Sequence, residues 1–128
     1  MGLLQFLQIA EDLELAGLHW MPEIGDEVSD RKHPDNISIL VDPQGMTPIE
    51  LRSSYLWLPT VEQMVTQVEV RQAILFHAGL EVSEAAFCYK TVLQSRGGPI
   101  ESKASTLRLA MGMALRNLLL SGTQSQVN

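Results

Sequence analysis

Five side chains that can bind cations lie within ten residues of one another, in the most polar segment of the chain. They are Asp26, Glu27, Asp30, His33 and Asp35. Carboxylate oxygens are the ligands that hard cations prefer, and imidazole suits transition metals. The spacing matches neither an EF-hand loop nor the His-Glu-x-x-His pattern, and two neighbouring bases, Arg31 and Lys32, oppose a bound cation. We therefore predict a mobile, solvated loop at residues 23–36 without a metal, with a short edge pairing at Glu27 and Val28 as an option, and we keep a metal site as the alternative.

A second candidate for chemistry is Cys88, the only cysteine of the chain. A thiol becomes a useful nucleophile when a base lies within hydrogen-bonding reach. If a hairpin turns near Val82 and Ser83, His77 falls directly opposite Cys88. No third side chain is in place to orient the imidazole, and none of the three histidines has a cysteine at zinc-binding spacing. We predict no catalytic residue, and we keep a Cys88–His77 pair as the alternative.

Charge and composition exclude several classes of function. The formal net charge is −6, and it is unevenly placed, with −8 on residues 1–64 and +2 on residues 65–128. An acidic chain repels phosphate backbones, so we predict no nucleic-acid binding. One cysteine cannot form an internal disulfide, and the longest apolar run, residues 107–120, contains two arginines. Residues 3–10 lack the preceding basic residues of a signal peptide. We therefore predict a cytoplasmic protein without a cofactor or a membrane partner.

The elements that must position these residues are organised around residues 54–72. Apolar residues at 55–58 predict a strand, and Pro59 favours a switch from strand to helix because it restricts the residue before it. Thr60 and Gln63 form a capping box, in which each side chain bonds the backbone N–H of the other residue. One face of the predicted helix is apolar and consists of Val61, Met64, Val65 and Val68.

Patterns elsewhere predict further elements. Helices are expected at residues 3–16 and at residues 105–120, where Gly122 ends the helix. A further short helix is expected after a second capping box, formed by Thr47 and Glu50. Strands are expected at residues 37–41, 55–58, 74–78 and 85–94, with an antiparallel hairpin formed by the last two. The predicted fold class is α+β, with one antiparallel sheet of about four to five strands and two to three packed helices. We expect a single domain over residues 1–122 and a disordered polar tail at residues 123–128.

The strand-to-helix junction carries a resemblance. The run from Trp57 to Met64 reads Trp-Leu-Pro-Thr-Val-Glu-Gln-Met. It resembles the Trp-Leu-Pro-x-x-x-Gln-Leu junction of small, uncharacterised bacterial and phage-encoded α+β domains, with Met64 in place of the usual leucine. Residues 104–118 are similar to the terminal helix of phage-type sandwich domains. The resemblance spans residues 55–118 at most. It implies a sheet with packed helices, and it implies no catalytic residue.

The last predicted helix has two apolar stripes. The first should pack on the sheet and consists of Leu107, Ala110, Met111, Ala114 and Leu118. The second lies roughly opposite and consists of Leu109, Met113 and Leu120, bordered by Arg116 and Asn117. An apolar stripe that faces water is typical of an interface, and a two-fold homodimer is the commonest arrangement. The alternative is that the helix at residues 3–16 covers this stripe within the monomer.

These patterns predict a non-enzymatic, protein-binding or structural domain that acts as a homo-oligomer. The possible interface residues are Leu109, Met113, Arg116 and Leu120. The alternative function is a small hydrolase or metal-dependent enzyme that uses the acid and histidine loop from Asp26 to Asp35, or Cys88 with His77.

Overall fold

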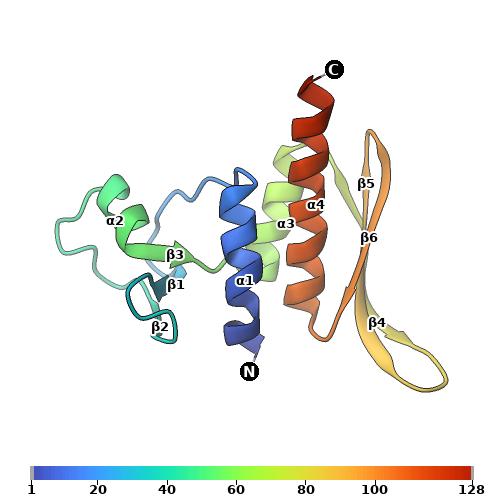
Figure 1. The fold of residues 1–128 in the computed structure, drawn as a ribbon, viewed down its shortest axis with the longest axis horizontal. Coiled ribbons are helices and arrows are strands. Elements are labelled where there is room, and N and C mark those ends of the chain that lie inside the picture. Colours follow the sequence, from blue (N-terminus) through green and yellow to red (C-terminus); the bar gives the residue numbers. More distant parts are fainter. Residues whose placement is uncertain (1, 128) are drawn as a thin grey trace.

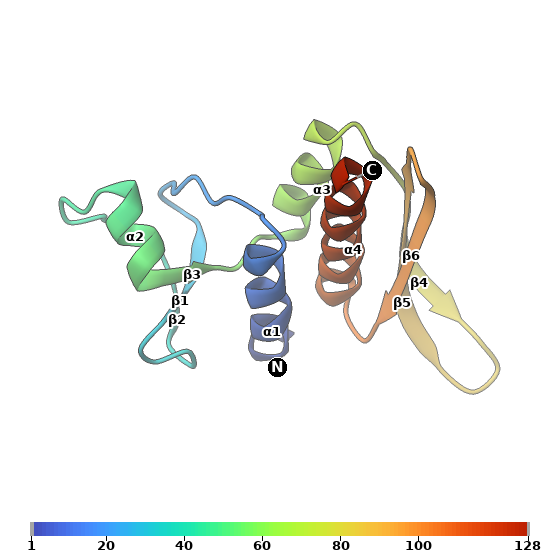
Figure 2. The same ribbon diagram turned by 45° about the horizontal axis from the view of Figure 1, so that its top comes forward.

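The structure is a computed structural model that describes residues 2–127 of the chain, and the side chains of residues 4–122. Within this range, four helices and six strands are arranged in layers (Figure 1). In chain order they are α1 (Gly2–Leu15), β1 (Glu27–Asp30), β2 (Ile37–Ile39), α2 (Pro48–Ser54), β3 (Tyr55–Trp57), α3 (Val61–Val70), β4 (Ile74–Val82), β5 (Phe87–Ser95), β6 (Gly98–Ala104) and α4 (Leu107–Val127). α1 lies between the first three strands and α4, and α4 lies between α1 and the last three strands (Figure 2).

The predicted α+β class is confirmed, but the prediction of one sheet is wrong. The described strands form two antiparallel sheets, in the orders β2-β1-β3 and β4-β5-β6. β2 and β3 of the first sheet lie within predicted strands, but β1 lies in the segment that we predicted to be a mobile loop. There Val28 pairs with Ser38 on one side and with Trp57 on the other, so β1 is the central strand. Val28 and Ser29 are buried, whereas Glu27 and Asp30 at the ends of this short strand are acidic. These acids made the segment look like a polar loop in the sequence.

Both predicted capping boxes are present. At the start of α2, Thr47 Oγ1 accepts a bond from the Glu50 backbone at 3.2 Å, and Glu50 Oε1 accepts one from the Thr47 backbone at 2.9 Å. The same pair of bonds, at 3.2 and 2.9 Å, joins Thr60 and Gln63 at the start of α3. Each box satisfies backbone N–H groups that have no partner within the helix.

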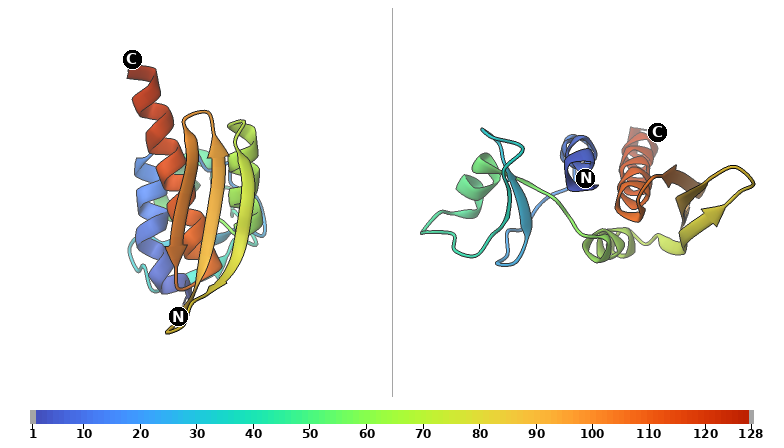
Figure 3. Two further views of the ribbon diagram at one scale, coloured as in Figure 1. Left: turned by 90° about the vertical axis from the view of Figure 1, so that its right-hand side faces the viewer. Right: turned by 90° about the horizontal axis from the view of Figure 1, so that it is seen from below.

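The second sheet is a meander of three long strands, seen face-on in Figure 3. The hairpin of β4 and β5 is confirmed, but β4 continues to Val82 and the turn occupies residues 83–86, where the Ser83 N–H donates to the Ala86 carbonyl at 2.8 Å. Strand β6 was not predicted. Its first two residues are Gly98 and Pro99. Gly98, where the turn passes into the strand, has a φ of +116°, a conformation that favours glycine.

α4 buries residues on two of its sides. Ala110, Met111 and Ala114 of the first predicted stripe are buried, and α4 packs on β5 and β6. On another side α4 crosses α1 at Gly112. A Cβ atom at that position would lie 2.5 Å from Ile9 Cγ2. α4 therefore connects the second sheet to the rest of the molecule.

α4 runs to Val127, past Gly122, where the sequence predicted its end. Gly122 does not adopt the positive φ of a helix-ending glycine, so the helix continues through it. Although α4 is 21 residues long, no helix in the described part of the chain is both long and apolar enough to cross a membrane.

Candidate functional site

Asp26, one of the predicted metal ligands, is buried and accepts three hydrogen bonds. Its Oδ2 accepts from Trp20 Nε1 at 2.8 Å and from the Glu23 backbone at 2.9 Å, and its Oδ1 accepts from Gln63 Nε2 at 2.9 Å. Because Gln63 also caps α3, the carboxylate joins the segment before β1 to the first turn of α3. The bonds account for the burial of this acid without a cation, since a buried carboxylate requires donors.

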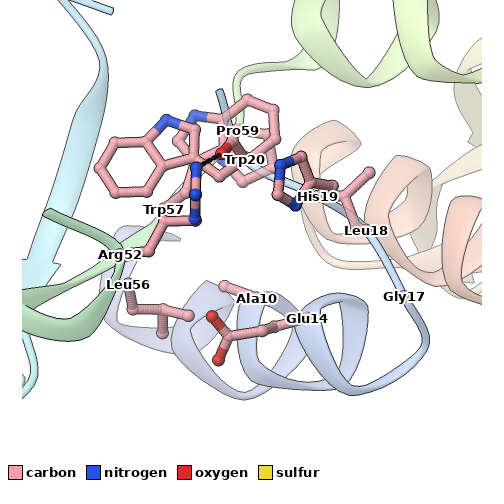
Figure 4. Close-up of a pocket in the computed structure, with 10 residues that line it drawn as sticks. All are labelled: Ala10, Glu14, Gly17, Leu18, His19, Trp20, Arg52, Leu56, Trp57 and Pro59. Carbon is pink, nitrogen blue, oxygen red and sulfur yellow. Dashed lines mark hydrogen bonds between the residues drawn. The ribbon is translucent and has the colours of Figure 1, made fainter. Parts of the chain in front are cut away.

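A cleft of about 270 Å³ lies beside this carboxylate, between α1, α2 and β3 (Figure 4). One wall is formed by Trp20 and Trp57, whose rings are stacked with centroids 6.4 Å apart and an interplanar angle of 12°. Arg52 Nη1 donates to the Trp20 carbonyl at 3.0 Å. Glu14 lies on the opposite wall and forms an ion pair with Arg31. Arg52 and Glu14 therefore bind other parts of the same chain.

The described lining of this cleft lacks a hydroxyl or thiol nucleophile. The described residues that line it include one imidazole, His19, and one carboxylate, Glu14, but no serine, threonine or cysteine. Covalent catalysis needs a nucleophile next to a base. Glu14 is held by Arg31, and Arg52 is held by the Trp20 carbonyl, which is typical of structural contacts.

The structure separates the two residues of the predicted catalytic pair. Cys88 lies opposite Glu81, and His77 lies opposite Val92. The predicted register is wrong because the hairpin turns at residues 83–86 and not at Val82 and Ser83. His77 and Cys88 are therefore four positions apart along the strands, about 13 Å at the usual rise per residue. At that distance the imidazole is not a base for the thiol.

The other predicted metal ligands are spread over different contacts. Glu27 pairs with Arg108, with Oε1 and Nη1 3.4 Å apart, and Asp30 accepts a bond from a backbone N–H two residues on. His33 and Asp35 lie in the turn between β1 and β2, where their backbone groups bond neighbouring residues. Among the residues that the structure describes, no group of three or more His, Cys, Asp or Glu side chains is placed to hold a metal ion.

Exposed apolar side chains gather at the free end of the β4–β5 hairpin. We define the apolar tip as Leu80, Val82 and Phe87, which are 51%, 72% and 71% exposed. Val82 lies directly opposite Phe87, so both share the face of the sheet that farther along β5 carries the fully buried Leu93. The hairpin extends past the first turn of α4 (Figure 1). The apolar face of the sheet is therefore longer than the helix that covers it.

The opposite face of the same sheet carries a ladder of ion pairs. Lys90 Nζ lies 3.3 Å from Glu81 and 3.2 Å from Glu101, and Lys103 Nζ lies 2.9 Å from Glu81. Hydrogen bonds from Lys103 and Lys90 hold the pKa of the Glu81 carboxyl below its ordinary value. Hydrogen bonds to Glu101 and Glu81 raise the pKa of Lys90. The hairpin is thus charged on one face and apolar on the other.

The sequence contained a signal for the apolar tip that our prediction did not use. We ended the strand at residue 78 because Gly79 follows it. The alternation continues beyond the glycine, with Leu80 and Val82 on one face and Glu81 on the other. Extending this period of two through Gly79 would have placed both apolar residues on the exposed part of the hairpin.

The predicted interface residues of α4 are only partly accessible. Leu109 and Met113 are partly buried and pack against the core. Arg116 Nη1 lies 3.2 Å from Asp12 Oδ2 on α1, and Leu120 is 46% exposed. Much of the apolar surface of this stripe is therefore covered within the protein, and its role as an interface stays a prediction.

The fold and the hairpin define a small α+β domain in which two antiparallel sheets flank a layer of helices. Comparison with protein-family models, with curated proteins and with solved structures finds no match. The resemblance at residues 55–118 therefore assigns no family, and the function must be inferred from the geometry.

Proposed function

We propose that this chain is a non-enzymatic, protein-binding domain that acts as a homo-oligomer through the β4–β5 hairpin. The observation that carries the proposal is the apolar tip, in which Leu80, Val82 and Phe87 share one face beyond the cover of α4. Burying a large apolar side chain is worth about 1.5–3 kcal/mol, so adjacent exposed residues of this kind favour association.

The composition of the chain supports a protein partner rather than a charged polymer. The chain has a net charge of −6, which opposes binding to nucleic acid. The proposal includes a cytoplasmic location, which the single, partly buried Cys88 supports, because secreted domains of this size often carry disulfides. These two parts of the proposal depend on composition and are independent of the hairpin.

Light scattering behind size exclusion, at tens of micromolar protein, tests the proposal with a matched pair of variants. Val82 and Val41 are 72% and 73% exposed, and only Val82 belongs to the apolar tip. We expect an oligomeric wild type that Val82→Lys dissociates and Val41→Lys leaves intact. A monomeric wild type would refute the proposal. An oligomer that is lost with Val41→Lys but kept with Val82→Lys would place the interface elsewhere.

A further inference from the structure

We infer that β4 of one chain pairs antiparallel with β4 of a second copy, about a two-fold axis at Gly79. This inference rests on the proposed function, since it specifies how the homo-oligomer forms. It joins the two β4-β5-β6 sheets into one continuous sheet of six strands. The partner is a second copy because the free backbone groups, the polar side chains and the apolar residues of β4 all complement themselves in this arrangement.

β4 is the sheet edge most open to strand addition. It is an edge strand of nine residues, and between Ile74 and Val82 it contains neither proline nor lysine. The opposite edge, β6, carries Pro99, Glu101 and Lys103, which oppose the addition of another strand. The edge strands of the other sheet have three residues each. The bulge beside His77 limits the regular part of the β4 edge to about residues 77–82.

The turn of the hairpin reveals which backbone groups of β4 are free. The Ser83 N–H donates to the Ala86 carbonyl, so Ser83 directs its backbone groups at the neighbouring strand. Because these directions alternate along a strand, residues 81 and 79 also face β5, whereas Ala78, Leu80 and Val82 face the open edge. A two-fold axis at Gly79 sets Ala78 against Leu80 of the second copy, and Leu80 against Ala78. Each N–H and C=O of these four residues then finds a partner.

The same axis places an imidazole opposite each carboxylate. It sets His77 against Glu81 of the second copy, twice, on the face of the sheet that carries the ion-pair ladder. Moving the axis to Leu80 would instead pair Glu81 with Gly79, and moving it to Glu81 would oppose two carboxylates. At the axis itself Gly79 meets Gly79, and the His77 imidazole lies 3.8 Å from where a Gly79 Cβ would be. Only the Gly79 axis gives each carboxylate an imidazole opposite it.

The apolar residues of the β4 edge also complement themselves. Phe76 and Val82 of this strand are 70% and 72% exposed. In this register Phe76 lies at the level of Val82 of the second copy.

Cysteine cross-linking tests this geometry, in a background where Cys88→Ser removes the only native thiol. Residues at the axis form a non-hydrogen-bonded pair with Cα atoms about 4.5 Å apart, within the range of a disulfide. We expect Gly79→Cys to form a covalent dimer under mild oxidation. His77→Cys is the matched control, because its two copies would lie about 13 Å apart.

A second measurement uses charge and does not depend on cross-linking. His77→Glu places two carboxylates opposite each other, whereas His77→Lys places an ammonium group opposite Glu81. We expect the dimer dissociation constant of His77→Glu to exceed that of His77→Lys by about tenfold or more.

The possible outcomes separate the two proposals. A dimer that cross-links at position 79 and not at 77 supports β4 pairing. A dimer that Val82→Lys dissociates, but that does not cross-link at position 79, refutes β4 pairing and leaves the hairpin interface intact. A monomeric wild type refutes both. Equal dissociation constants for the Glu and Lys variants of His77 would also overturn the Gly79 register.

Discussion

Gly112 on α4 and Ile9 on α1 mark a helix crossing that leaves no space for a side chain. A Cβ at Gly112 would lie 2.5 Å from Ile9 Cγ2 and 2.9 Å from Phe6 Cε1. Because Phe6 is fully buried, neither neighbour can move aside without disturbing the core. We expect Gly112→Ala to lower the free energy of unfolding by about 1–3 kcal/mol in urea denaturation, the usual cost of overpacking.

Gly122, farther along the same helix, is the matched control. A Cβ there would meet nothing within 4 Å. Since alanine is a better helix former than glycine, we expect Gly122→Ala to raise the free energy of unfolding by up to about 1 kcal/mol. Two substitutions of the same kind in one helix should therefore have opposite signs. A Gly112→Ala variant as stable as wild type would show that α1 and α4 are not packed this closely.

The two capping boxes should differ in importance, although their local geometry is the same. Gln63 donates to the buried Asp26 in addition to capping α3, whereas Glu50 and Thr47 are exposed. Gln63→Ala leaves an oxygen of Asp26 and the Thr60 N–H without their partners. We expect this variant to lose about 2 kcal/mol of stability in urea denaturation. Glu50→Ala should lose clearly less, because water can replace its bonds. Equal losses would argue that the Gln63–Asp26 bond does not contribute.

The ion-pair ladder should make stability depend on pH at the acid end. Hydrogen bonds from Lys103 and Lys90 lower the pKa of Glu81, so the folded state binds a proton there less readily than the unfolded state. The resulting stabilisation is present above the unfolded pKa, about 4.3, and is lost as the pH falls through the folded value. We expect Glu81→Gln to melt below wild type at neutral pH, with the difference closing at more acidic pH. A difference that is constant across this range would contradict the ladder.

Features that depend on a few adjacent residues were predictable from the sequence, and features that depend on distant partners were not. The box of Thr60 and Gln63 was found because all its atoms lie within four residues. Strand β1 was foreseen only as an optional edge pairing at Glu27 and Val28, because its central place and the burial of Val28 depend on β2 and β3, which follow it in the chain. The hairpin register was wrong by four positions because its turn, Ser-Glu-Ala-Ala, contains none of the usual glycine, asparagine or proline signals.

The candidate site also has features that were predictable from adjacent residues and features that were not. The alternation that places Leu80 and Val82 on one face is local, and it was visible in the sequence. Their exposure is not local, because it depends on how far α4 extends over the sheet. The close contact at Gly112 was likewise not predictable, since the sequence does not show that α1 packs against this position of the helix. The second stripe of α4 was a correct pattern of apolar residues, but its accessibility depended on the same packing.

Substitutions in that second stripe decide between a structural role and an interface. Met113 is partly buried against the core, whereas Leu120 is 46% exposed near the end of the described side chains. We expect Met113→Glu to lower the free energy of unfolding by about 2 kcal/mol or more, since it brings a carboxylate into partly apolar surroundings. Leu120→Glu should change the free energy of unfolding by less than about 0.5 kcal/mol, as surface substitutions usually do. Urea denaturation and light scattering on both variants give the answer. If the wild type is oligomeric and Leu120→Glu is a folded monomer, the interface lies on α4. A fully stable Met113→Glu variant would show that the stripe faces water.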